Sequence, residues 1–219
     1  MTIRDMVARH SNYTHTKDFI PTPPFATRAL FEYVQPSMKQ NTGIQGIWDP
    51  ACGKGHMCEV FKEYGYGGVY ASDIEDYGYP MTKTGDFKDI EMDDGNEMDV
   101  IVTNPPYALM ADFIRHGLDR ATKHFALLTR IQVLEGQARY NDFYSVVPPT
   151  KVAVFSDRIP FKTGVVVRKA PKMFTHCWVY WDMAKVKAGK NNSTELMWLP
   201  PDAQKKLEKE GDYDTNDDK

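Results

Sequence analysis

Residues 43–55 read GIQGIWDPACGKG, and this stretch decides the fold class. It opens with an apolar run that ends at Asp49 and predicts a short buried strand. A glycine-containing turn follows, and residues 54–64 have the apolar spacing of a helix. Glycines in such a strand–turn–helix unit let the backbone approach a ligand closely, although many such turns are purely structural. The spacing is not GxGxxG and the turn lacks a GKS or GKT ending, so neither a dinucleotide site nor a phosphate-binding P-loop is favoured.

Strands and helices alternate along the rest of the chain. Further strands are predicted at residues 67–72, 98–103, 124–129, 151–155 and 175–181, and further helices at 25–34, 108–123 and 132–147. This order favours an α/β fold with a mostly parallel sheet that carries helices on both faces. We expect an N-terminal arm at residues 1–20, one domain at 21–200, and a charged, partly disordered tail at 201–219.

The composition is that of a soluble globular chain. The 219 residues are 42% apolar and 26% charged, which is enough apolar material for one sizeable core. No stretch approaches the roughly 20 apolar residues of a membrane span, and the first residues have no apolar core of a secretory signal. Cys52, Cys58 and Cys177 form no CxxC pair, and the histidines show no ligand spacing with them. We therefore expect a cytoplasmic protein without disulfides and without a metal site.

Charge is distributed unevenly. Residues 73–99 hold ten acidic residues and two lysines, whereas residues 104–190 hold fourteen basic and six acidic residues. Runs of residues with the same charge often only form solvated surfaces. Successive blocks of opposite charge nevertheless favour a basic face that binds phosphates. The basic candidates for that face are Arg115, Arg120, Lys123, Arg130, Arg139, Lys151, Arg158, Lys162, Arg168, Lys169 and Lys172.

An acid and a proline corner follow two of the other predicted strands. Asp73 ends the second strand, about 20 residues beyond the glycine turn, where nucleoside-binding sheets place an acid on ribose hydroxyls. Ile74 beside it is apolar enough to pack on an adenine ring. Residues 104–107 read NPPY directly after the strand 98–103. Two prolines make a stiff corner, so an Asn side chain and a proline carbonyl can present acceptors to a planar amine while Tyr107 supplies a stacking face.

These segments together resemble the S-adenosylmethionine-dependent N6-adenine DNA methyltransferases, particularly the compact forms encoded by bacteriophages. DPACGKG at 49–55 is similar to the first cofactor loop of that family, SDIED at 72–76 to its ribose-binding acid, and NPPY at 104–107 to its amino-methylation motif. The match covers about residues 19–182. It implies that residues 21–200 are a class I, Rossmann-like methyltransferase domain, with a doubly wound, seven-stranded, mostly parallel sheet whose last strand is antiparallel.

The resemblance also implies roles for individual residues. S-adenosylmethionine would be held by Phe19, Thr22, Pro23, Asp49, Pro50, Ala51, Gly53, Gly55, Asp73, Ile74, Asp86, Phe87 and Asn104. The catalytic corner would comprise Asn104, Pro105, Pro106 and Tyr107. Tyr107 would stack on one face of a flipped adenine and Phe161 on the other, with Phe174 as the second choice. The DNA backbone would meet Arg130, Arg139, Arg158 and Lys162.

The expected partner is DNA, as a duplex with a flipped adenine or as a single strand, in a bacterial or phage-infected cell. Many members of the family carry a separate target-recognition domain, for which this chain has no room. Specificity would then come from short insertions, or from a homodimer or a partner chain. NPPY also occurs in methyltransferases that act on RNA amines or on a protein glutamine, and these activities stay open, as does a cofactor-binding subunit without catalysis.

Overall fold

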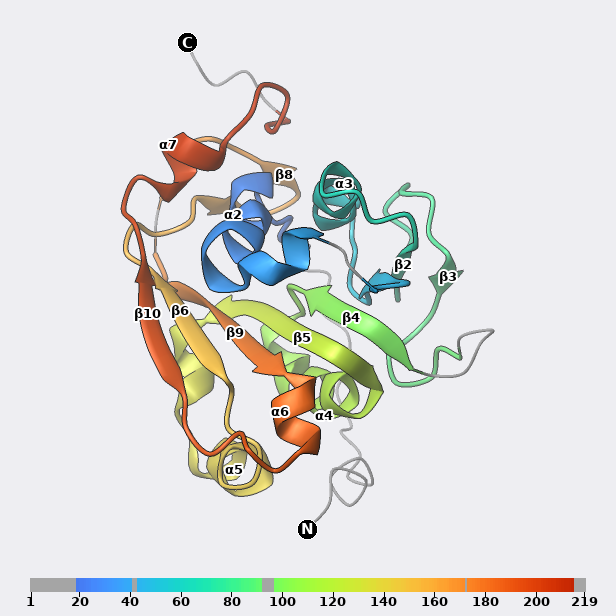
Figure 1. Cartoon of the computed structure of the whole chain (residues 1–219). Helices are drawn as coiled ribbons and strands as arrows, with labels where there is room; N and C mark the ends of the chain where they lie inside the picture. Colours follow the sequence, from blue (N-terminus) through green and yellow to red (C-terminus); the bar gives the residue numbers. More distant parts are fainter. Residues whose placement is uncertain (1–18, 41–42, 92–96, 172, 215–219) are drawn as a thin grey trace.

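The computed structural model describes residues 19–40, 43–91, 97–171 and 173–214. A twisted central sheet runs through the molecule, with helices on both of its faces (Figure 1). Almost all of the expected N-terminal arm and the last residues of the expected tail lie outside the described residues.

The described residues form a sheet of eight strands in the order β10-β6-β9-β5-β4-β1-β2-β3. Five neighbouring strands, from β5 to β3, are parallel to one another, and β9 runs antiparallel between β5 and β6. A separate hairpin joins β7 to β8. The strands are β1 (Ile47–Asp49), β2 (Val69–Asp73), β3 (Lys83–Thr84), β4 (Met98–Thr103), β5 (Ala121–Arg130), β6 (Lys151–Phe155), β7 (Phe161–Lys162), β8 (Val165–Val166), β9 (His176–Asp182) and β10 (Glu195–Leu199).

Helices cover the two faces of the sheet. Figure 1 shows α2 and α3 on one face and α4, α5 and α6 on the other. The α-helices are α2 (Pro24–Ala29), α3 (His56–Glu63), α4 (Met110–Arg120), α5 (Gln137–Arg139), α6 (Met183–Lys187) and α7 (Ala203–Leu207). The π- and 3-10 turns are η1 (Leu30–Val34), η2 (Pro36–Gln40), η3 (Tyr107–Leu109), η4 (Ile131–Leu134) and η5 (Tyr140–Tyr144).

The predicted α/β fold is confirmed, with two differences in detail. The sheet has eight strands rather than seven, because β10 adds a strand that follows β9 in the chain and pairs parallel to β6. The predicted helix at 132–147 is broken into η4, α5 and η5. The break lies at Gly136, whose φ of 110° is not helical.

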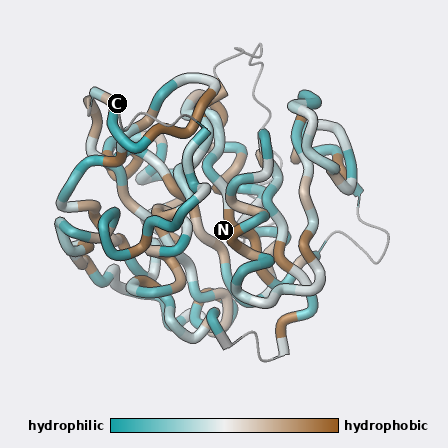
Figure 2. Tube along the Cα trace, turned by 90° about the horizontal axis from the view of Figure 1, so that it is seen from above, coloured by the Kyte–Doolittle hydropathy of each residue, from teal (hydrophilic) through white to brown (hydrophobic). Residues whose placement is uncertain are grey.

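Two apolar clusters hold the helices to the sheet, one on each face. Figure 2 shows the corresponding hydrophobic segments in the interior of the trace and hydrophilic loops around it. Trp48, Trp178 and Trp181 are almost fully buried, and each indole N–H donates to an oxygen, on Ser72, Ala26 and Val147 respectively. Buried indoles therefore tie strands to neighbouring elements without an unsatisfied donor.

Residues 201–214 of the expected tail pack on α2 through one buried cation. Arg28, which is 3% exposed, donates to Asp212 at 2.6 and 2.8 Å and to Glu63 of α3 at 2.7 and 2.9 Å. It also donates to the Leu207 carbonyl at 2.7 Å, at the end of α7. A single guanidinium thus joins α2, α3 and the C-terminal segment.

Asp212→Ala is expected to destabilise the fold by about 3 kcal/mol, because it removes one carboxylate from a buried, charged arginine. Urea unfolding followed by circular dichroism measures the change. Asp202→Ala is the matched control: its ion pair with Lys206 is exposed, so its loss should cost less than about 1 kcal/mol. Equal effects of the two substitutions would contradict the anchoring role of Asp212.

Candidate active site

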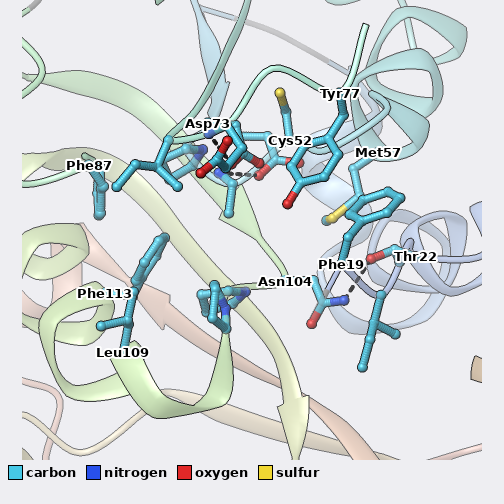
Figure 3. Close-up of a pocket in the computed structure, with 18 of the residues that line it drawn as sticks. Phe19, Thr22, Cys52, Met57, Asp73, Tyr77, Phe87, Asn104, Leu109 and Phe113 are labelled. Atoms are coloured by element: carbon cyan, nitrogen blue, oxygen red, sulfur yellow. Dashed lines mark hydrogen bonds between the residues drawn. The ribbon is translucent and has the colours of Figure 1, made fainter. Parts of the chain in front are cut away.

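The carboxyl ends of β1, β2 and β4 meet at one edge of the sheet, around a cavity of about 400 Å³. Figure 3 shows Asp73 and Cys52 on one side of this cavity and Asn104 on the other, with Phe87, Leu109 and Phe113 at one end. The lining residues are Phe19, Ile20, Pro21, Thr22, Asp49, Pro50, Ala51, Cys52, His56, Met57, Asp73, Ile74, Glu75, Tyr77, Gly85, Asp86, Phe87, Asn104, Pro105, Pro106, Tyr107, Ala108, Leu109, Phe113 and Arg130. Such a crevice at a topological switch point is where open α/β sheets bind ligands.

The glycine turn between β1 and α3 is fastened to the acid at the end of β2. The Gly53 N–H donates to Asp73 Oδ2 at 2.8 Å, and Gly53 has a φ of 52°. A Cβ at Gly53 would lie 2.1 Å from the Phe19 ring. Glycine is therefore required both by the backbone conformation and by the close approach of that ring.

Two buried carboxyls face the cavity. Asp49 is 1% exposed, and burial raises its pKa to about 7. Burial also raises the pKa of Asp73, although the backbone N–H groups of Gly53 and Glu75 oppose this shift. Near neutral pH the cavity therefore holds a carboxyl that ionises readily when a positive group enters.

The proline corner places an amide beside the same cavity. Asn104 follows β4, and its Nδ2 donates to Thr22 Oγ1 at 2.9 Å, as drawn in Figure 3. Because the amide nitrogen is engaged by Thr22, the Oδ1 atom is the group presented to an incoming N–H donor. Phe19 lies on the same N-terminal strip as Thr22, and its ring stacks on the Tyr77 ring at 4.5 Å between centroids.

An apolar wall closes one end of the cavity. Phe87 is buried and packs edge-on against Trp48, with 5.0 Å between ring centroids. Its ring also lies 5.1 Å from the ring of Phe113 on α4. Ile74, which is 37% exposed, also lines the cavity. An apolar slot of this kind suits a flat heteroaromatic ring.

Tyr107 belongs to a cluster of rings at the ends of β4, β5 and β9. Its hydroxyl lies 2.9 Å from His176 Nε2, and His176 Nδ1 lies 3.1 Å from the Phe174 carbonyl. The guanidinium carbon of Arg130 lies 4.1 Å from the Tyr107 ring centroid and 3.7 Å from the Phe174 ring centroid. Phe161 instead packs on His176, with ring centroids 4.5 Å apart.

Most of the residues predicted for the cofactor and for catalysis line this single cavity. Those that do are Phe19, Thr22, Asp49, Pro50, Ala51, Asp73, Ile74, Asp86, Phe87, Asn104, Pro105, Pro106 and Tyr107. Pro23, Gly53, Gly55 and Phe161 are not among the lining residues. Gly53 and Gly55 shape the turn: both have positive φ values, and they pack against the rings of Phe19 and Tyr79 respectively.

Several lining residues escaped the sequence analysis. Cys52, His56, Met57, Glu75, Tyr77, Leu109 and Phe113 are the clearest cases. His56 and Met57 are the first residues of α3 after the glycine turn, and Glu75 and Tyr77 follow Asp73 closely. Their nearness to recognised motifs was the available signal, whereas Phe113 lies on α4 and its place depends on how that helix packs.

The basic residues do not all serve a phosphate-binding face. Arg120 is buried and donates to the carbonyls of Phe87, Lys88 and Ile90. Arg115 is buried beside Asp112. Expecting these two arginines on a phosphate-binding face was therefore wrong, because both are used inside the fold. Three further residues were predicted to contact the DNA backbone. Arg139 donates to carbonyls of its own segment, and Arg158 interacts within the molecule. Lys162 is exposed on β7.

Solved structures share this architecture. A Pyrococcus horikoshii protein assigned to the RNA methyltransferases aligns with a TM-score of 0.56 and 11% identity, over 82% of this chain and 96% of that chain. A Thermoplasma acidophilum protein aligns with a TM-score of 0.51 and 14% identity, over 72% of this chain and 89% of that chain. No family model and no curated protein matches the sequence. The chain has the class I methyltransferase fold.

The cavity of this methyltransferase fold fits S-adenosylmethionine in size and chemistry. Its volume of about 400 Å³ lies in the range of small-molecule sites. Asp49 and Asp73 suit the charged and hydroxylated parts of the cofactor, and the apolar wall at Phe87 suits its ring. Among the described residues no group of three or more His, Cys, Asp or Glu could hold a metal ion. No helix in the described ranges is both long and apolar enough to cross a membrane.

Binding of S-adenosylmethionine is expected to strengthen about tenfold as the pH rises from 5.5 to 7.0. Burial raises the pKa of Asp49 to about 7, so this carboxyl must lose its proton to face a cation, and low pH opposes that loss. The cofactor amine stays charged throughout this range. Calorimetry at several pH values measures the effect, and Asp49→Asn should reduce the dependence to the part that Asp73 contributes. A pH-independent affinity in the unmodified protein would contradict this role.

Proposed function

We propose that this protein transfers a methyl group from S-adenosylmethionine to the exocyclic N6 amine of adenine in DNA, after flipping the base out of the helix. The observation that carries the proposal is the position of the NPPY corner. Asn104 and Tyr107 line the same cavity as Asp49 and Asp73, so a target amine and the cofactor can meet in one space.

The residues around the cavity divide into two ends. Asp73 and Ile74 at the end of β2 would hold the ribose and adenine of the cofactor, with Asp86 and Phe87 beside its ring. Asp49 and the glycine turn would face its methionine part, and Thr22 and Phe19 would cover that part from the N-terminal strip. When bound there, S-adenosylmethionine supplies an electrophilic methyl group whose bond to sulfur breaks as the N–C bond forms, leaving S-adenosylhomocysteine.

The corner at 104–106 prepares the amine for this transfer. The lone pair of an exocyclic adenine amine is delocalised into the ring, which makes the amine a weak nucleophile. Asn104 Oδ1 and the Pro105 carbonyl can accept its two N–H bonds, directing the lone pair toward the cavity and stabilising the positive charge that develops on nitrogen. Asn104 is not a base, so the released proton passes to water.

The ring cluster around Tyr107 offers aromatic faces on which a flipped target base could stack. Tyr107 lies against the cavity with its hydroxyl held by His176. Phe174 is the better-supported second ring, because a planar group already lies between it and Tyr107, whereas Phe161 packs on His176. A base stacked inside a duplex cannot reach such a slot, so flipping is required, at a cost of a few kcal/mol that stacking on Tyr107 and Phe174 would offset.

Methyl transfer from labelled S-adenosylmethionine tests the proposal directly. We expect label in unmethylated DNA, and N6-methyladenine after nuclease digestion. RNA and a total protein extract are assayed in parallel, because NPPY is compatible with RNA amines and with glutamine. Label confined to RNA or protein would replace the proposed substrate, and cofactor binding without transfer to any of the three would favour a non-catalytic subunit.

Asn104→Ala is expected to lower the rate of methyl transfer by at least about 100-fold, because the acceptor that orients the amine is lost. Affinity for S-adenosylhomocysteine should stay within a few-fold, since Asn104 contributes mainly to the target end. Single-turnover transfer and calorimetry measure the two effects. Asn192→Ala, at an exposed position, is the control and should change neither. A large loss of cofactor affinity with Asn104→Ala would contradict the assigned role.

A further inference from the structure

Arg130 lies between the aromatic rings of Tyr107 and Phe174. The space between these two rings is the target slot, in which the flipped base would stack. Arg130 is the last residue of β5, and its guanidinium carbon is 4.1 Å from the Tyr107 ring centroid and 3.7 Å from that of Phe174. These distances are close to the contact separation of stacked carbon atoms, about 3.5–4.0 Å. The two rings are therefore spaced for one flat group, and a flat cation fills the space.

A single imidazole links the Tyr107 hydroxyl to the backbone at Phe174. His176 is buried, and burial lowers its pKa to about 4, so the ring is neutral near pH 7. Its Nδ1 donates to the Phe174 carbonyl and its Nε2 accepts from the Tyr107 hydroxyl. The Tyr107 ring and the Phe174 backbone are thus held without Arg130, and we expect both to stay in place when the guanidinium leaves.

The Arg130 guanidinium contacts two rings, whereas Arg28 and Arg139 are held by oxygens. The Nε atoms of Arg28 and Arg139 donate to oxygens at 2.9 Å or less. The Nε of Arg130 is buried and, like that of Arg115, has no hydrogen-bond partner among the described residues. When the guanidinium leaves the slot, its Nε can donate to water. The free energy lost with the two cation–π contacts is of the same order as the free energy gained when a base stacks on the same rings.

We propose that Arg130 occupies, in the free protein, the slot that the target base takes during the reaction, and that entry of the base displaces it. This inference rests on the proposed function, since Arg130, Tyr107 and Asn104 line one cavity. Arg130 then acts as a specificity-determining residue. Only a flat group that also bonds to Asn104 competes well with a cation already stacked on both rings.

The binding test uses adenosine, which carries no phosphate and so reports the slot alone. Calorimetry with S-adenosylhomocysteine present compares the unmodified protein with Arg130→Ala, Arg130→Lys and Arg168→Ala. We expect about tenfold tighter binding with Arg130→Ala and a smaller gain with Arg130→Lys, whose ammonium is not flat. Arg168→Ala removes an ion pair with Glu208 and should change nothing. No gain in affinity with Arg130→Ala overturns the inference.

A spectroscopic test uses the unmodified protein, so it does not depend on how a variant folds. The Nε–H signal of Arg130, identified by its absence in Arg130→Lys, should be shifted upfield by the ring currents of Tyr107 and Phe174. Saturating adenosine should remove that shift, while the Arg139 signal stays in place because its Nε bonds to carbonyls. A signal that never shows the ring-current shift, or keeps it at saturation, overturns the inference.

These outcomes separate the inference from the proposed function. If the protein methylates adenine in DNA but Arg130→Ala does not bind adenosine more tightly, the displacement of Arg130 is rejected and the proposed activity stands. A gain in adenosine affinity without methylation of DNA supports the displacement and rejects the DNA substrate.

Discussion

The parallel pairing of β1 with β4 is the constraint on which the site depends. Ile47 lies beside Val100 and Trp48 beside Ile101, so both strands run the same way and end at the same edge of the sheet. The chain goes from β1 outward to β2 and β3, and then returns to the other side of β1 as β4. The loops after β1 and β4 consequently separate at the switch point, and a crevice opens between Asp49 and Asn104.

Local contacts keep that crevice in shape. The bond from Gly53 to Asp73 joins the first loop to the second, and the bond from Asn104 to Thr22 joins the proline corner to the N-terminal strip. Each bond uses only part of the capacity of its side chain: Asp73 has further lone pairs, and Asn104 has its amide oxygen. The same side chains can therefore hold the loops together and still receive a ligand.

The third component of the site comes from the antiparallel strand. Pairing of β9 with β5 puts His176 opposite Arg130, and the parallel pairing of β4 with β5 brings Tyr107 to the same edge. Three strand ends thus contribute a ring, an imidazole and a guanidinium to one cluster. A parallel neighbour would begin at the other edge of the sheet, so the reversal of β9 is what brings His176 and Phe174 to the target slot.

The sequence by itself was sufficient for the α/β class, for most strands and for the residues at three strand ends. The buried strands are rich in apolar residues, Asp49 and Asp73 end two of them, and Asn104 directly follows a third, so local pattern was enough to find these residues. Only the tertiary structure decided the eighth strand, the broken helix at 132–147, the burial of Arg115 and Arg120, and the partner of Tyr107. Those features depend on strand register and on packing between residues far apart in the chain. Phe161 and Phe174 look alike in sequence, and it is the register of β9 against β5 that places Phe174, through Arg130, next to Tyr107.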